Sequence, residues 1–78
     1  MSEPITVDAR FRPPPEPMQM AVAALDDLTP DGELIFLIHR EPFPLYDMLR
    51  MNGYQHHTEV HADGTLAIHI RHAAQSQL

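Results

Sequence analysis

Cationic side chains are concentrated in two short segments of this 78-residue chain, whose formal net charge is −6. Arg10 and Arg12 follow the first β-type run, and His39 and Arg40 follow the longest apolar run, so three of the five arginines stand there. Guanidinium groups bind carboxylates and phosphates through paired, charge-assisted hydrogen bonds. The pattern predicts an edge that binds a protein partner or an anionic ligand. Its candidate residues are Arg10, Phe11, Arg12, Pro14, Glu16, His39, Arg40 and Glu41.

The same arginines have a second interpretation, which the sequence leaves open. Asp8, Glu16 and Glu41 stand beside them, so Arg10 and Arg40 could instead form ion pairs that brace the loops. The proline-rich run 12–17 is equally ambiguous. It either stiffens the connection by lowering the entropy of the unfolded chain, or presents a rigid surface with Phe11 exposed to a partner.

Histidines form the second group with possible chemistry, because five of the six lie from residue 56 onward. If His57 and His69 pair across a hairpin, their β-carbons are about 5 Å apart, close enough for two imidazoles to share an ion. A catalytic zinc site uses three protein ligands and a structural site uses four. We therefore predict no metal site and no cofactor, with His57 and His69 as the residues to test.

Composition excludes several function classes. The absence of cysteine rules out thiol catalysis, persulfide transfer, disulfides and iron–sulfur clusters. The chain has no glycine-rich phosphate loop, nucleophile elbow or helical His-Glu-His motif, so we expect no enzyme. Its acidic balance argues against a nucleic-acid partner. The longest apolar run, 34–38, is too short for a bilayer and 1–10 lacks a secretory pattern, so we expect a cytoplasmic monomer or weak homodimer without membrane contact.

Hydrophobic periodicity predicts the elements that must position these side chains. Residues 5–7 are a short β-type run, and helical spacing of apolar residues over 17–28 begins at Pro17, where a missing N–H is harmless. Residues 33–38 are apolar without alternation, as in a strand with neighbours on both sides. A shorter helix follows over 45–52, with Gly53 just beyond its end.

The last third of the chain alternates with period two over 54–61 and 65–71. A three-residue loop with Gly64 in the left-handed conformation pairs Val60 with Leu66 and His57 with His69, which separates polar from apolar side chains better than a two-residue turn does. In that register the solvent face carries residues of both strands, namely Gln55, His57, Glu59, His61, Thr65, Ala67, His69 and Arg71.

The predicted order is β-α-β-α-β-β, an α+β two-layer sandwich with a four-stranded mixed sheet and both helices on one face. We assign residues 1–72 to a single domain and 73–78 to a flexible tail. The parallel first two strands would bring their carboxyl ends and the two helix N-termini together, which is where the arginine segments lie.

The start of the chain resembles the TusA/SirA-like family of small bacterial sulfur carriers. Val7-Asp8-Ala9-Arg10 and Pro15-Glu16-Pro17-Met18 are similar to that family's Leu-Asp-Ala-Arg start and Cys-Pro-x-Pro helix opening. The resemblance implies the same element order and a persulfide-carrying cysteine before the second motif. Pro14 stands at that position here, so sulfur transfer does not carry over.

A closer resemblance is to the cysteine-less bacterial family catalogued as domain of unknown function 2249. It extends over the Asp-Ala-Arg start, the Pro-Pro-Pro-Glu-Pro run and the segment 40–46, Arg-Glu-Pro-Phe-Pro-Leu-Tyr. The resemblance implies the fold, and an association with hemerythrin-like and nitrogen-oxide-related proteins. We expect a non-catalytic binding or adaptor domain. The alternative is an accessory of redox or nitrogen-oxide metabolism with metal or cofactor contact on the histidine face.

Overall fold

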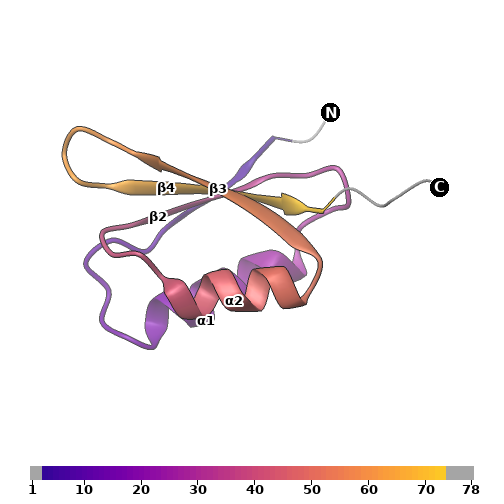
Figure 1. Ribbon diagram of the computed structural model, residues 1–78, viewed down its shortest axis with the longest axis horizontal. Helices are drawn as coiled ribbons and strands as arrows, with labels where there is room; N and C mark the ends of the chain where they lie inside the picture. The colour runs from indigo at the N-terminus through magenta and orange to yellow at the C-terminus, as the bar shows by residue number, and fades with distance from the viewer. Residues whose placement is uncertain (1–2, 74–78) are drawn as a thin grey trace.

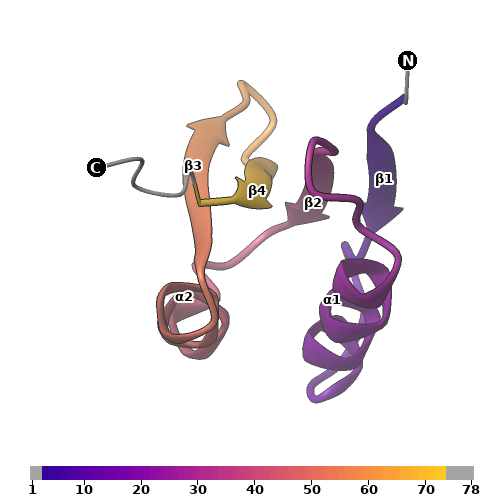
Figure 2. The same cartoon turned by 90° about the vertical axis from the view of Figure 1, so that its right-hand side faces the viewer.

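The structure, a computed structural model, describes residues 3–73 and has the predicted α+β architecture. Its elements are β1 (Ile5–Asp8), α1 (Glu16–Asp26), β2 (Leu34–Ile38), α2 (Phe43–Met51), β3 (Tyr54–Val60) and β4 (Leu66–His72). The sheet order is β1-β2-β4-β3, with β1 parallel to β2 and the other two pairs antiparallel. Both helices cover the same face of the sheet (Figures 1 and 2). The predicted fold is confirmed.

The core lies between the sheet and the helices because each central strand directs alternate side chains toward them. Fully buried side chains of β2 and β4 meet those of α2, and α1 contributes a buried alanine and a buried leucine. The residues concerned are Leu34, Phe36, Ile68, Ile70, Leu45, Leu49, Ala21 and Leu25. The lack of alternation in 34–38 agrees with the position of β2 between β1 and β4, where its other face is also half covered.

The helix boundaries differ from the predicted ones by about one turn or less. The helix α1 begins one residue early and ends at Asp26, because the Asp27 N–H bonds to the Ala24 carbonyl at 3.0 Å and tightens the last turn. The helix α2 begins at Phe43 rather than residue 45, since Pro44 fits its first turn. Gly53 follows α2 with φ +81°, in its predicted role.

The hairpin of β3 and β4 has the predicted register, with Val60 opposite Leu66 and His57 opposite His69. Gly64 has φ +90°, and the His61 N–H bonds to the Thr65 carbonyl at 2.8 Å to close the loop. The predicted exposure was wrong for Thr65 and Ala67, which are buried.

Thr65 lies in the hairpin loop just before β4, where its backbone N–H donates to Asp63 at 2.9 Å and its hydroxyl lies 3.5 Å from Nε2 of His39. The burial of Ala67 follows from the position of β4 between β2 and β3. Ala67 pairs with Leu37 on one side and Glu59 on the other, and these longer side chains cover it. Residues 74–78, most of the predicted tail, lie outside the described residues. Ala73 donates its backbone N–H to the Gly53 carbonyl at 2.7 Å. Among residues 3–73, no helix is long and apolar enough to cross a membrane.

Candidate functional site

The carboxyl ends of β1 and β2 lie together at one edge of the sheet, next to the N-termini of α1 and α2, as the parallel pairing requires. A cavity of about 640 Å³ opens there, which we call the edge cavity. Five of the eight predicted edge residues line it, namely Phe11, Arg12, Pro14, His39 and Arg40. The other three, Arg10, Glu16 and Glu41, do not.

Apolar side chains of α1, β2 and α2 form the floor of the edge cavity, and none of them was among the predicted edge residues. Phe36 and Leu45 are buried in the floor, and the half-buried Met18 and Ile38 also line it. Ala9 and six prolines complete the lining, and the prolines are Pro13, Pro14, Pro15, Pro17, Pro42 and Pro44. The paired proline segments were visible in the sequence, but their convergence follows only from the parallel pairing of β1 with β2.

Phe11 lies at the rim with its side chain 88% exposed. Its φ is +65°, a left-handed conformation that costs a side-chain-bearing residue about 1–2 kcal/mol. The Phe11 ring meets the His39 ring edge-on, with centroids 4.7 Å apart. An exposed aromatic residue in a strained backbone conformation is typical of functional loops.

Arg10 is a brace rather than part of the cavity wall. Its Nε and one Nη each donate to a different carboxylate oxygen of Asp8 at 2.8 Å, and its backbone N–H donates to the same carboxylate at 3.1 Å. These hydrogen bonds lower the pKa of Asp8 to about 2. The alternative of structural bracing therefore describes Arg10, and the pair holds the loop at the end of β1.

The other carboxylates near the edge are also engaged, but not by Arg40. Glu16 lies 3.5 Å from Arg12 in an exposed i, i+4 pair. Glu41 accepts a hydrogen bond from the Tyr46 hydroxyl. Within residues 3–73 the Arg40 side chain has no ion pair or hydrogen bond, so its guanidinium is available to a ligand at the rim.

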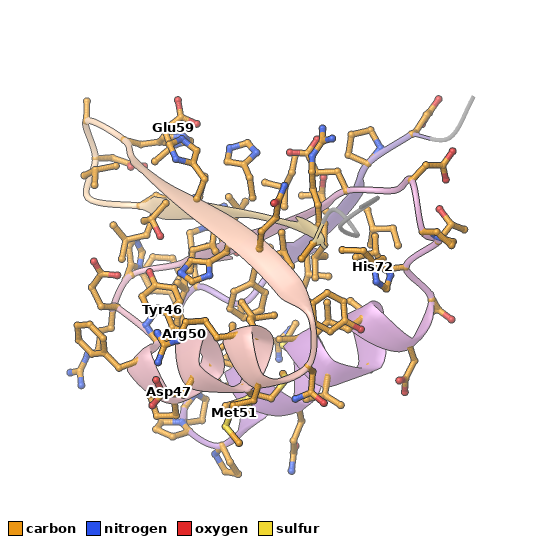
Figure 3. All side chains as sticks on the ribbon, turned by 45° about the vertical axis from the view of Figure 1, so that its right-hand side comes forward. Tyr46, Asp47, Arg50, Met51, Glu59 and His72 are labelled. Atoms are coloured by element: carbon orange, nitrogen blue, oxygen red, sulfur yellow. The ribbon has the colours of Figure 1, made fainter. Side chains whose placement is uncertain are left out.

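Tyr46 links α2 to β3 and keeps Glu41 in place. Its hydroxyl lies 2.8 Å from the Thr58 hydroxyl as well as contacting Glu41, and its ring stacks on His56 with centroids 4.4 Å apart. Burial, together with the bond to Glu41, raises the pKa of Tyr46. In Figure 3, Tyr46 points from α2 toward the sheet, while Asp47 and Met51 lie on the far side of the helix.

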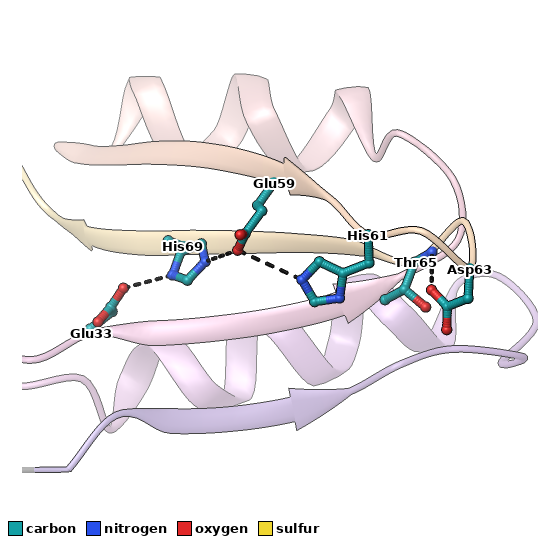
Figure 4. Close-up of polar contacts among 6 residues, drawn as sticks. All are labelled: Glu33, Glu59, His61, Asp63, Thr65 and His69. Atoms are coloured by element: carbon teal, nitrogen blue, oxygen red, sulfur yellow. Dashed lines mark hydrogen bonds and ion pairs between the residues drawn. The ribbon is translucent and has the colours of Figure 1, made fainter.

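The predicted histidine face is present on the side of the sheet away from the helices. The His57 and His69 rings lie with centroids 5.9 Å apart. His69 Nδ1 is 2.8 Å from Glu33 and its Nε2 is 3.2 Å from Glu59, which also lies 3.6 Å from His61 (Figure 4). Because carboxylates only accept hydrogen bonds, both ring nitrogens of His69 donate, and its pKa is raised chiefly by the bond to Glu33.

The hydrogen bonds of His69 argue against His57 and His69 as a pair of metal ligands. A metal needs an imidazole lone pair, and carboxylates occupy both nitrogens of His69. Within residues 3–73, no group of three or more histidine and acidic side chains is placed to hold an ion. Sequence reasoning missed Glu33, because it precedes β2 and no local pattern relates it to the distant hairpin.

Comparison with known proteins gives one family. The family described as an uncharacterized conserved protein, DUF2249, matches residues 6–72, nearly all of the chain. No curated protein and no solved structure matches the chain.

Proposed function

This chain belongs to the DUF2249 family of uncharacterized conserved proteins, and we propose that it is a non-catalytic binding domain. It contacts a protein partner or an anionic ligand at the edge cavity. One observation carries the proposal: in a chain of net charge −6, Arg40 lies unpaired within residues 3–73 at the rim of an apolar cavity.

The scaffold supports a binding role rather than sulfur transfer. Pro14, which stands at the position of the sulfur carriers' cysteine in the resemblance to the TusA/SirA-like family, lines the edge cavity. We propose that the domain keeps the exposed edge of a sulfur-carrier-like scaffold and uses it for recognition. No thiol is available for covalent chemistry, since the chain has no cysteine.

The carboxylates near the edge are poorly placed for acid–base catalysis. Asp8, Glu16 and Glu41 are each held by a neighbouring side chain, and none of them lines the edge cavity. His39 does line it, but the residue is exposed, so water is not excluded from its ring. General acid–base catalysis needs a positioned group within hydrogen-bond reach of the reacting atom.

Affinity capture from the native host tests the proposal. Arg40→Ala should abolish capture of the partner or acidic ligand that the wild type retains, whereas Arg50→Ala should preserve it. Arg50 is a matched control because its replacement by alanine changes the net charge by the same amount. Arg50 lies on α2, is paired with Asp47 and does not line the edge cavity. Equal capture by the wild type and Arg40→Ala would contradict the proposal.

We do not extend the proposal to a metal or cofactor on the histidine face. A cavity of about 500 Å³ is present there, lined by Glu33, Glu59 and His69 among others. The hydrogen bonds from both nitrogens of His69 to Glu33 and Glu59 make it a structural bridge across β3, β4 and the start of β2. His57→Ala is therefore expected to leave capture unchanged.

A further inference from the structure

We propose that the ligand of the edge cavity is an amphipathic organic acid, with its apolar body on the cavity floor and its carboxylate on Arg40. This inference rests on the proposed function and names the chemical class of the ligand. It follows from the size of the cavity, the nature of its lining and the position of its charge.

The size and depth of the edge cavity suit a small molecule. Its volume of about 640 Å³ falls within the range of roughly 300–1,000 Å³ that is typical of ligand pockets. The half-buried Met18 and Ile38 line its inner part, above the fully buried Phe36 and Leu45, whereas Phe11, His39 and Arg40 are exposed at its opening. Apolar surface therefore lies deep and polar groups lie at the rim, which matches a ligand with an apolar body and one charged end.

The proline content argues against an extended peptide as the occupant. Six lining residues are prolines, which have no N–H to donate. A peptide backbone laid along these walls would leave carbonyl groups without partners, and each unpaired buried group costs about 1–3 kcal/mol. A hydrocarbon body needs no such partners. The rigid proline walls also lose little conformational entropy when a ligand binds.

The charge at the rim favours a carboxylate. Arg40 can form two parallel hydrogen bonds with a carboxylate, and His39 and Arg12 lie on the same rim. The carboxylate of Glu16 already lies in the first turn of α1, so the α1 helix dipole is partly neutralised. The first turn of α2 has no acidic residue and its N-cap has no side-chain hydrogen bond, so the positive end of the α2 dipole adds to the charge of Arg40. A doubly charged phosphate is less suitable because Glu16 already lies 3.5 Å from Arg12 and the chain carries a net charge of −6.

Titration of the whole protein with octanoate, followed by NMR, tests this inference. Octanoate should shift the methyl signals of Met18, Ile38 and Leu45 in the edge cavity and leave those of the remote Met51 unchanged. Arg40→Ala should weaken octanoate binding by roughly tenfold or more, since a charge-assisted hydrogen bond is lost. Arg50→Ala should bind octanoate as the wild type does.

Two further ligands separate the contribution of the apolar body of octanoate from that of its carboxylate. Octanamide, which has the same body without the charge, should bind more weakly and with equal affinity to the wild type and Arg40→Ala. Acetate, which has the charge without the body, should not shift the floor methyl signals. Equal binding of acetate and octanoate, or an effect of Arg50→Ala equal to that of Arg40→Ala, would overturn the inference.

A capped peptide of glycine, leucine, glutamate and glycine tests the competing occupant. Binding of this peptide in preference to octanoate would overturn the inference and leave the proposed function intact. The same holds if octanoate fails to bind while capture still depends on Arg40. If neither octanoate binding nor capture depends on Arg40, both proposals fail.

Discussion

Nδ1 of His69 lies 2.8 Å from a carboxylate oxygen of Glu33, although 36 positions separate the two residues. Glu59 accepts a hydrogen bond from the opposite ring nitrogen, so one imidazole connects the start of β2 to both strands of the hairpin (Figure 4). Such a bridge between two carboxylates is strongest when the imidazole is charged.

The bridge predicts a pH dependence of stability. The pKa of His69 is raised above its usual value of about 6.5, so its contribution is complete below that pH and is lost as the pH rises through the folded-state pKa. The pKa of Glu59 is lowered from its usual 4.5, chiefly by the bond to His69, so its contribution is lost as the pH falls.

Unfolding measured between pH 4 and pH 9 should therefore show a maximum of stability in the mildly acidic range. His69→Gln should remove the decline in stability at higher pH, and His57→Gln, which alters the same face, should retain it. An NMR titration midpoint of His69 below the usual histidine value would contradict the prediction.

Phe11 predicts a difference between two small substitutions. Both Phe11→Ala and Phe11→Gly remove the ring, but only glycine relieves the left-handed backbone at φ +65°. We expect the free energy of unfolding of Phe11→Gly to be about 1 kcal/mol higher than that of Phe11→Ala. Urea denaturation of the two variants measures this difference, and equal midpoints with equal slopes would show that the backbone there is not strained.

Tyr46 predicts a link between the core and the edge cavity. Tyr46→Phe keeps the ring stacked on His56 but leaves Glu41 and Thr58 without their hydroxyl partner, which should cost about 1 kcal/mol of stability. The released Glu41 is adjacent to Arg40 in the chain and can compete for its guanidinium. We therefore expect weaker octanoate binding by Tyr46→Phe, and Glu41→Gln combined with Tyr46→Phe should restore it.

Pro14 predicts the behaviour of a thiol placed at the edge. A cysteine introduced by Pro14→Cys would lie beside the N-terminus of α1 and near Arg12, both of which favour a thiolate. Its pKa should fall below the usual value of about 8.5. The rate of alkylation by iodoacetamide against pH measures it, with Ala62→Cys in the exposed hairpin loop as the control. Equal pKa values for the two cysteines would count against a sulfur-carrier-like scaffold.

Local patterns were sufficient for most of the fold. Period-two alternation on both sides of Gly64 predicted the register that places His57 opposite His69, because a shift by one residue would send every apolar side chain to solvent. Pro17 and Gly53 marked helix ends through their backbone restrictions. These features depend on residues that are close in the chain.

The candidate site was only partly predictable. The arginine segments were correctly placed at one edge, but the sequence left open whether each arginine braces a loop or faces a ligand. In the structure Arg10 donates hydrogen bonds to Asp8, and Glu41 accepts one from Tyr46. Arg40 therefore has no ion pair within residues 3–73. Carboxylates compete for the same cations over distances of a few ångströms, and this competition is decided by side-chain geometry.

The sequence by itself determined the elements, their order and the chemistry that is excluded, because the absence of cysteine and the spacing of apolar residues need no third dimension. Tertiary structure alone decided that Phe36 and Leu45 form the floor of the edge cavity, that Ala67 is covered, and that Glu33 meets His69. The physical reason is that burial and pairing depend on which distant segments pack together, and periodicity carries no information about such long-range contacts.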